Sequence, residues 1–378
     1  MHRFRVRTEK GVYPVSVGVG AWQELRRFGT LRYSSVFILT ESAIWNLWGD
    51  QFRRESGLGA AQVLRVPSGE ASKSLAQAAR VAEGLLRGGA DRRSLLVLFG
   101  GGVIGDLGGF AASTYMRGID CIQVPTTLVG QVDSAVGGKT AVNLGGTKNL
   151  LGTFYPPRMV LADPAVLASL SGRIFQSGLY EVAKHAILAG RGLFEQLEQK
   201  VESLTPKNAA SLADLVARAV KVKVDVVNRD EREASLRQVL NLGHTFGHAL
   251  EAATGYRRFL HGEAVGWGLL AVTLLAERLA HQSPPARYQR GRQGSRVSEA
   301  SDAERIRRLI WSLGPLPSIR DVSARRIARL LIHDKKAVAG QIHWVIPERI
   351  GKVRVVSGIP VETAEAVWRE LQDSVIQT

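Results

Sequence analysis

Leu95-Leu-Val-Leu-Phe-Gly-Gly-Gly-Val-Ile-Gly-Asp106 is the stretch that decides the fold. An apolar strand, Leu95–Phe99, runs directly into a glycine-rich turn that ends at Asp106. Glycine has no Cβ atom, so its backbone N–H can approach phosphate oxygens, and a following helix N-terminus adds a favourable dipole. The stretch therefore predicts a backbone that lies close to an anionic ligand.

Strands and helices alternate on either side of this stretch. We expect strands at Tyr13–Val19, Ser35–Thr40, Gln62–Val66, Leu95–Phe99 and Cys121–Val124, and helices at Ala21–Phe28, Ala43–Glu55, Ser74–Gly88 and Gly105–Tyr115. Such alternation predicts a mostly parallel sheet with helices on its faces, in a Rossmann-like α/β domain. Ligands of these sheets bind at the carboxyl ends of the strands, so loops 66–73, 99–106 and 124–127 are expected to face one ligand.

The second half of the chain has a helical pattern. Helices are expected at Leu179–Leu188, Leu193–Leu204, Ala209–Asn228, Leu236–Ala253 and Gly262–Leu279, with the next strand only at Gln341–Ile346. We expect an α/β domain over residues 1–165 and a mainly α-helical domain over residues 166–378. Residues 282–302 lack apolar periodicity and are rich in serine, proline and arginine, which predicts a mobile loop.

Composition restricts the classes of function. The net charge of the 378 residues is +16, but residues 281–337 alone hold thirteen Arg or Lys against five Asp or Glu. Aromatic residues such as Tyr288 are sparse among these charges, so we expect a solvated basic surface and no nucleic-acid partner. We expect no membrane partner either, because no apolar run is long enough to span a bilayer. The single cysteine, Cys121, and the lack of an apolar leader favour a cytoplasmic protein.

Several polar residues have the chemistry of a nucleotide and phosphate site. The turn matches neither the dinucleotide fingerprint Gly-x-Gly-x-x-Gly nor a P-loop, but Asp106, Thr126 and Thr127 could hydrogen-bond ribose and amide groups. Lys139 lies in the context Gly-Gly-Lys and Lys148 in Gly-Thr-Lys-Asn, where the backbone allows close approach, so a phosphate or carboxylate clamp explains them better than solvation does.

A metal site is suggested by four residues of the helical half. His244 and His248 lie four positions apart, on one face of a helix, while Glu181 and His261 lie on other helices. Catalytic zinc takes three His or Glu ligands and leaves one position open, so four candidates compete for three places. The zinc-protease motif His-Glu-x-x-His is absent.

Together, the longer motifs of the chain resemble 3-dehydroquinate synthases, which are sugar-phosphate cyclases. The matching segments are Gly100–Asp106, Tyr115–Gly118, Pro125–Leu128, Gln131–Asp133, Val136–Thr140, Lys148-Asn149, Glu181–Lys184, Asn241–His248 and His261–Val265. The resemblance implies NAD, a zinc (or cobalt) ion and a homodimer. It also implies conversion of 3-deoxy-D-arabino-heptulosonate 7-phosphate to 3-dehydroquinate and phosphate, by transient oxidation, phosphate elimination, reduction and aldol closure.

The resemblance also assigns roles to individual residues. It implies Glu181, His244 and His261 as metal ligands. It implies NAD contacts from Gly69, Glu70, Lys73, Gly102, Val103, Ile104, Gly105, Asp106, Thr126, Thr127, Lys139 and Lys148. The implied substrate and catalytic residues are Arg117, Asp133, Lys139, Lys148, Asn149, Lys184, Lys223, Glu233, Arg237, Asn241, His248 and Lys335.

The chain departs from the family pattern at two serines. Ser68 stands where Asp is usual, and Ser235 replaces a usual Gly; if position 235 needs a positive φ, serine there costs roughly 1 kcal/mol. Two related activities remain alternatives. One is a cyclase of the 2-deoxy-scyllo-inosose synthase type, whose substrate lacks a carboxylate, and the other is an NAD- and metal-dependent polyol dehydrogenase. Arg237 and Lys223 favour a substrate with a carboxylate.

Overall fold

The computed structural model describes residues 1–282, 300–332 and 342–374, so the expected loop at 282–302 lies almost wholly outside the described residues. The chain divides into two compact units. The first comprises Met1–Gly178 and Leu204–Ala234, and the second Leu179–Ser203 and Ser235–Thr378. Of the helices that span the described residues, none is both long enough and apolar enough to cross a membrane.

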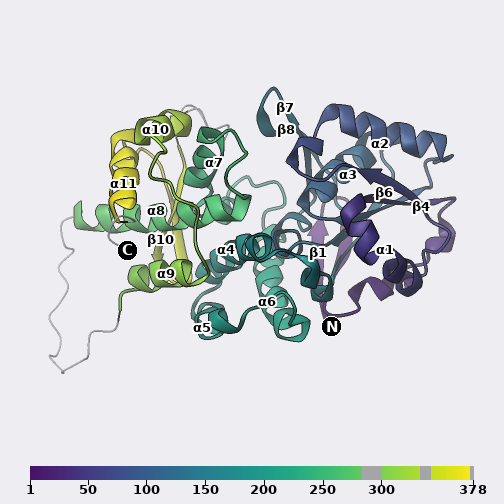
Figure 1. The fold of residues 1–378 in the computed structure, drawn as a ribbon, viewed down its shortest axis with the longest axis horizontal. Coiled ribbons are helices and arrows are strands. Elements are labelled where there is room, and N and C mark those ends of the chain that lie inside the picture. The colour runs from purple at the N-terminus through teal and green to yellow at the C-terminus, as the bar shows by residue number, and fades with distance from the viewer. Residues whose placement is uncertain (283–299, 333–341, 375–378) are drawn as a thin grey trace. The chain divides into compact units, whose positions relative to one another are not determined.

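The first unit is built on a seven-stranded sheet, the purple and blue part of Figure 1, in the order β1-β2-β9-β6-β5-β3-β4. Only the edge pair of β1 and β2 is antiparallel among these neighbours. The strands are β1 (His2–Thr8), β2 (Gly11–Val17), β3 (Val36–Glu41), β4 (Gln62–Val66), β5 (Leu95–Gly100), β6 (Asp120–Pro125) and β9 (Met159–Ala162). The predicted mostly parallel sheet is confirmed.

The central strand β5 is buried on both faces, which explains its uninterrupted apolar sequence. Leu96 and Leu98 face one apolar cluster, and Leu95, Val97 and Phe99 face the other. Helices α2 (Leu75–Arg87) and α3 (Gly102–Thr114) contribute to the first cluster, and α1 (Ser42–Ser56) and the 3₁₀ helix η1 (Ala21–Arg27) to the second. The sheet therefore has a covered core on each side.

A hairpin that the sequence pattern did not reveal follows the 3₁₀ helix η4 (Tyr115–Arg117), β6 and the π-helix η5 (Gly130–Ser134). Its strands are β7 (Lys139–Leu144) and β8 (Thr147–Phe154), and Gly145 and Gly146 both have positive φ between them. Two successive residues with positive φ give the tight turn that fits the twist of a hairpin. Lys139 and Lys148 therefore lie on strands, where the sequence analysis expected no strand.

Helix α6 (Ala209–Val227) belongs to the first unit, although the expected boundary at residue 165 assigned it to the helical domain. The Asn228 side chain, which follows α6, accepts a hydrogen bond from Arg7 N at 2.7 Å and donates one to Arg5 O at 3.0 Å. These bonds satisfy backbone groups of β1, which is the edge strand of the sheet within the described residues. The edge thus holds the end of α6 against the sheet.

The second unit is mainly helical and runs from teal (α4 and α5) to yellow in Figure 1. Its elements are most of α4 (Gly172–Ala189), α5 (Arg191–Lys200), the 3₁₀ helix η8 (Leu236–Asn241), α7 (His244–Ala253), α8 (His261–Gln282), α9 (Asp302–Ser312), α10 (Ala324–Ile332), the strand pair β10 (Trp344–Arg349) and β11 (Lys352–Val356), and α11 (Val361–Ser374). Three further 3₁₀ turns, η2 (Thr30–Arg32), η3 (Glu70–Ser72) and η6 (Pro164–Ser169), lie in the first unit, and η7 (Val201–Ser203) in the second.

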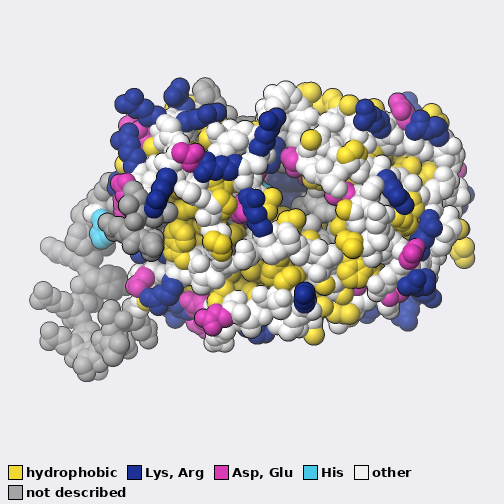
Figure 2. Space-filling view, in the orientation of Figure 1, with side chains coloured by type: hydrophobic (Ala, Val, Ile, Leu, Met, Phe, Trp, Pro, Cys, Tyr) yellow, Lys and Arg dark blue, Asp and Glu magenta, His cyan; other side chains and the backbone are white. Residues whose placement is uncertain are grey.

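Helix α10 shows why residues 281–337 are so basic. Its buried residues Ala324, Ile327, Ala328 and Leu331 recur at helical spacing, and its arginines occupy the exposed face. Figure 2 shows lysine and arginine side chains gathered over this part of the second unit. Within the described part of residues 281–337, the arginines of α10 therefore lie on a solvated helix face.

The expected helix Leu236–Ala253 is wrong. It is a 3₁₀ turn, η8, followed by a separate helix, α7, and the break lies at Gly243, where φ is +78°. Ser235 has φ of −154°, so the penalty considered for a left-handed serine does not apply; the left-handed residue nearby is Glu233, at φ 62°.

Candidate active site

Glu181, His244 and His261 come together in the second unit, from helices α4, α7 and α8. Glu181 Oε1 lies 3.2 Å from His261 Nε2 and 3.5 Å from His244 Nε2. Ligand atoms bound tetrahedrally to zinc at about 2.0–2.2 Å lie about 3.3–3.5 Å from one another, so both distances suit ligands of one zinc ion. The ligand atoms of all three residues lie within 4.8 Å of one another. Three protein ligands also leave a fourth position for water or substrate.

Glycines allow the three helices to approach this closely. A Cβ atom on Gly268 would lie 1.8 Å from the Gly243 carbonyl oxygen, so α8 packs directly against the residue that precedes α7. A Cβ atom on Gly266 would lie 2.8 Å from the ring of Tyr180, the neighbour of Glu181 on α4. Larger residues at 266 and 268 would therefore move the ligand-bearing helices apart.

The charges around the three ligands favour a cation. Glu181 is fully buried, and its Oε2 lies 2.6 Å from Lys184 Nζ in an ion pair. Burial lowers the pKa of His261, but the Glu251 and Glu181 carboxylates outweigh burial and raise that pKa to about 10. Two carboxylates and one ammonium leave net negative charge beside the ring, which a divalent ion would neutralise.

His248, the fourth candidate from the sequence, lies beside the ligand rings on α7. Its ring centroid is 5.5 Å from that of His244 and 6.1 Å from that of His261. His248, Glu251 and His261 form a second group whose ligand atoms lie within 4.8 Å of one another. Glu251 belongs to no motif noted in the sequence, although its spacing from His248, three positions along one helix, could have indicated it.

In the first unit, helix α3 begins at Gly102, almost directly after β5 and three residues before the expected start at Gly105. Gly101 caps the helix without a side-chain hydrogen bond, which leaves backbone N–H groups of the first turn available to an anion. The Thr126 hydroxyl is buried and has no hydrogen-bond partner within the described ranges. Free N–H groups and an orphaned hydroxyl beside strand ends fit a dinucleotide site.

Close packing also requires glycine at several positions of α3. A Cβ atom on Gly108 would lie 2.3 Å from Leu98 Cδ2, and one on Gly109 would lie 2.4 Å from Thr140 Cγ2. Gly105 would meet the Gln123 amide at 2.7 Å. These three glycines let α3 pack closely on the sheet and on β7. The sequence interpretation, which gave the glycines to an anionic ligand, is therefore incomplete.

A polar network connects two segments that the resemblance assigns to NAD, residues 69–73 and 102–106, with the β7–β8 hairpin. Lys73 Nζ, almost fully buried, contacts both the Asp106 carboxylate and the Asn149 side chain. Burial raises the pKa of Asp106, and the Lys73 ammonium opposes the rise. Asn143 lies at a bulge of the hairpin; it donates to Glu70 Oε1 at 2.8 Å and accepts from Asn149 N at 2.9 Å. Sequence reasoning missed Asn143, because its role depends on the bulge.

Two ion pairs join substrate candidates of the first unit. Asp133, on the π-helix η5, contacts Lys223 of α6 with Oδ1–Nζ at 2.7 Å, and both side chains are largely buried. Lys139 contacts Glu233. Short π-helical turns occur often at functional sites, because they redirect side chains out of the regular helical path.

Unusual backbone geometry marks the same candidates. Of the described non-glycine residues, five have positive φ: Met116, Arg117, Asn149, Glu233 and Tyr256. Three of them are substrate candidates, Arg117, Asn149 and Glu233. Left-handed conformations cost free energy in residues with a Cβ atom and concentrate at functional sites.

Other candidates are placed separately. Arg117 follows the last turn of α3, a helix of 13 residues that spans about 20 Å, so it lies far from the helix N-terminus at Gly102. It lines a cavity of about 760 Å³ with other cations, including Lys10 and Arg158. Arg237 and Asn241 lie on η8 in the second unit, with Arg237 buried, and Lys335 lies outside the described residues.

Family models match most of the chain. The model described as 3-dehydroquinate synthase N-terminal matches residues 63–177, and that described as 3-dehydroquinate synthase C-terminal matches residues 178–337. A 3-dehydroquinate synthase from Solibacter usitatus is 39% identical over 359 residues, covering 95% of this chain and 96% of the relative. One from Pelotomaculum thermopropionicum is 40% identical over 365 residues, covering 95% and 94%.

Solved structures of cyclases have the same fold. A 2-epi-5-epi-valiolone synthase from Streptomyces hygroscopicus, with NAD⁺ and Zn²⁺ bound, superposes with a TM-score of 0.83 at 26% identity and covers 98% of this chain and 100% of its own. A 2-deoxy-scyllo-inosose synthase with carbaglucose-6-phosphate, NAD⁺ and Co²⁺ gives a TM-score of 0.81 at 24% identity, covering 98% and 99%. From the family models and the sequence relatives together, the chain belongs to the 3-dehydroquinate synthase family.

Proposed function

We propose that the chain converts 3-deoxy-D-arabino-heptulosonate 7-phosphate to 3-dehydroquinate and inorganic phosphate, with NAD and a divalent cation, zinc or cobalt, as cofactors. The observation that carries this proposal is the spacing of Glu181, His244 and His261, which suits one zinc ion in a chain of this family. When bound, NAD accepts and returns a hydride, and the cation polarises the oxygen of the alcohol that is oxidised.

The protein's own residues bind and orient the substrate. Charged side chains that already face counter-charges hold their geometry before substrate arrives, so less ordering is needed on binding. Lys223 is aligned by Asp133, and Lys139 by Glu233. Their ammonium groups are therefore available, in fixed directions, for the carboxylate or phosphate of the substrate.

On the metal-binding side, Lys184 fixes the orientation of Glu181, since one carboxylate oxygen faces Lys184 and the other faces the two histidine rings. His248 lies beside these rings and is the imidazole suited to hold or move a proton of the substrate. The buried guanidinium of Arg237 suits a bidentate contact with a carboxylate.

Arg117 supports a homodimer as part of this proposal. It follows the C-terminal end of α3, about one helix length, roughly 20 Å, from the nucleotide end of the same unit. If Arg117 binds substrate, as family membership implies, a second copy of the chain is its natural source. We also propose a cytoplasmic location, which the single buried cysteine, Cys121, supports.

Substrate choice tests the proposal. Purified protein with NAD and zinc is assayed for phosphate release from the heptulosonate phosphate and, separately, from glucose 6-phosphate. We expect release from the heptulosonate phosphate alone, because only that substrate offers a carboxylate to the cationic side chains. Turnover of glucose 6-phosphate instead would identify a 2-deoxy-scyllo-inosose synthase activity.

A further inference from the structure

His261 has an acceptor at each of its two ring nitrogens. Nε2 lies 3.2 Å from Glu181 Oε1, within the proposed metal-ligand set, and Nδ1 lies 3.3 Å from Glu251 Oε2. A neutral imidazole carries one N–H, so the nitrogen that donates determines which nitrogen has the free lone pair. Donation from Nδ1 to Glu251 leaves Nε2 free to bind a cation.

His244 has the same arrangement with a different acceptor. Its Nδ1 lies 3.2 Å from the Leu242 carbonyl oxygen, and its Nε2 lies 3.5 Å from Glu181 Oε1. Both imidazoles therefore direct Nε2 toward Glu181 and have an oxygen behind Nδ1. The shared pattern indicates that the outer oxygens set the tautomer of both ligand rings.

Burial and backbone hydrogen bonds hold Glu251 where it can accept the Nδ1–H of His261. Its side chain is 2% exposed. It lies near the end of α7, where its carbonyl oxygen accepts from Tyr256 N at 2.8 Å and from Thr254 Oγ1 at 3.2 Å. These bonds fix the backbone at the point where the chain leaves the helix toward His261.

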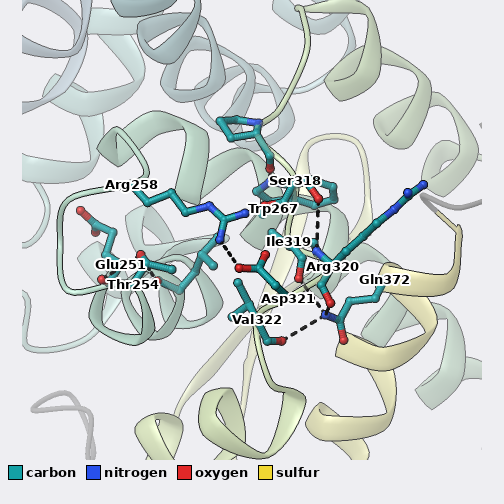
Figure 3. A network of polar contacts seen from close by, with 12 residues as sticks. Glu251, Thr254, Arg258, Trp267, Ser318, Ile319, Arg320, Asp321, Val322 and Gln372 are labelled. Carbon is teal, nitrogen blue, oxygen red and sulfur yellow. Dashed lines mark hydrogen bonds and ion pairs between the residues drawn. The ribbon is translucent and has the colours of Figure 1, made fainter.

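The loop between Glu251 and His261 is fixed at its middle as well. Arg258 donates to Asp321 Oδ2 at 2.7 Å and to the Ser318 carbonyl oxygen at 2.5 Å, as Figure 3 shows. Gln372 of α11 in turn donates to the Ile319 carbonyl oxygen at 2.7 Å, in the segment that receives Arg258. The loop is thus held near Glu251 and at its middle by contacts other than the Glu251–His261 contact.

We propose that Glu251 is a positioning residue for the metal site: it accepts the Nδ1–H of His261, fixes the tautomer and raises the basicity of Nε2. This inference rests on the proposed function, because it requires a cation at Glu181, His244 and His261. It also assigns the second group, His248, Glu251 and His261, to hydrogen bonding, since Nδ1 cannot donate a proton and bind a second ion at once.

Zinc affinity tests the inference without reference to turnover. Competition titration against a chromophoric chelator compares the full-length wild type with Glu251→Ala and Glu251→Gln. Losing an outer acceptor of a ligand histidine typically weakens metal binding by about 10–100-fold, and we expect Glu251→Ala to fall in that range. Glu251→Gln keeps an acceptor oxygen and is expected to recover part of the loss.

Asp321→Asn is the matched control. It weakens the Arg258 contact of the same loop but touches neither ring, so we expect the zinc affinity of wild type. A loss in Asp321→Asn equal to that in Glu251→Ala would assign the effect to loop order and overturn the proposal. Unchanged affinity in Glu251→Ala would overturn it directly.

Histidine ¹⁵N chemical shifts give a second readout, which tests the role of Glu251 even if Glu251→Ala does not fold. In zinc-loaded wild type we expect His261 protonated at Nδ1, and in Glu251→Gln a shifted Nδ1 signal. An unchanged signal would contradict the role of Glu251. Two zinc ions per wild-type chain, one of them lost in Glu251→Gln, would make Glu251 a ligand and also contradict it. If wild type binds no zinc, the proposed function fails first, and the inference with it.

Discussion

Glu181 Oε1 lies 3.2 Å from His261 Nε2, although the two residues lie on different helices and far apart in the sequence. Both are ligand candidates, and the Glu181 side chain is fully buried. A buried carboxylate is costly unless its charge is compensated. Lys184 compensates part of that charge, and a divalent ion between the carboxylate and the two imidazoles would complete the compensation.

Replacement of His261 by alanine should remove zinc and activity but leave the fold intact. The proposed site is catalytic, and the buried apolar residues of the unit, among them Phe246, Trp344 and Trp368, do not depend on the metal. The measurements are zinc content by atomic absorption, phosphate release, and circular dichroism. Full turnover by a zinc-free His261→Ala protein would refute the metal assignment.

Asp133→Ala should destabilise the protein far more than Asp225→Ala. Asp133 pairs with Lys223, and both side chains are largely buried, so truncation leaves a desolvated ammonium and should cost about 1–3 kcal/mol. Asp225 pairs with Lys221 on the exposed face of the same helix, where such pairs contribute about 0.3–0.5 kcal/mol. Urea unfolding gives both values, and equal losses would show that the Asp133–Lys223 pair is effectively solvated.

The Lys223→Met protein should have a higher KM for the heptulosonate phosphate than wild type, because Lys223 is proposed to bind the substrate's charge.

The sequence predicted the parallel sheet and the shared helix face of His244 and His248, because both depend on features that are local in the chain. Burial on both faces makes β5 continuously apolar, and His244 and His248 share a helix face at spacing four. The ligand Glu181 could be chosen over His248 only through the family resemblance. Spacing along one helix says nothing of which side chains on other helices are near.

What the sequence did not predict depends on tertiary contacts or backbone angles. Gly243 interrupts the helical pattern with a positive φ that periodicity cannot show, and the β7–β8 hairpin lies among glycines, where no strand was expected. Asn143 and Glu251 act through a bulge and a cross-loop contact. Neither has a motif of its own.

Glu233→Gly should raise stability and lower activity. Glu233 has φ of 62°, a conformation that costs residues with a Cβ atom about 1–2 kcal/mol and costs glycine almost nothing. The substitution also removes the partly exposed contact with Lys139, which stabilises the protein by about 0–1 kcal/mol. We therefore expect a gain of about 1 kcal/mol in the free energy of unfolding, with loss of turnover.

Glu233→Gln separates the two effects, since it keeps the Cβ atom and removes the charge. It should lose activity without gaining stability. If Glu233→Gly is no more stable than Glu233→Gln, the left-handed backbone at this position is not strained.

Cys121 should be unreactive in the native protein and should stabilise it less as pH rises. Burial, together with the Asp120 carboxylate, raises the pKa of the thiol from 9.0 to about 12. The folded state therefore keeps the proton while the unfolded state loses it. The stability from this group is complete below pH 9 and is lost as pH rises toward 12.

Iodoacetamide labelling and unfolding of wild type and Cys121→Val test this prediction. We expect no labelling before unfolding, and a stability advantage of wild type over the variant that shrinks above pH 9. Rapid labelling of the native protein at neutral pH would show that the thiol is accessible.

The most direct test of the central claim follows phosphate and reduced nicotinamide in one reaction with the heptulosonate phosphate and a catalytic amount of NAD. We predict many phosphate molecules released per NAD, no accumulation of NADH, and loss of release when NAD is omitted or a chelator removes the metal. Stoichiometric NADH without phosphate release would identify a dehydrogenase and contradict the account.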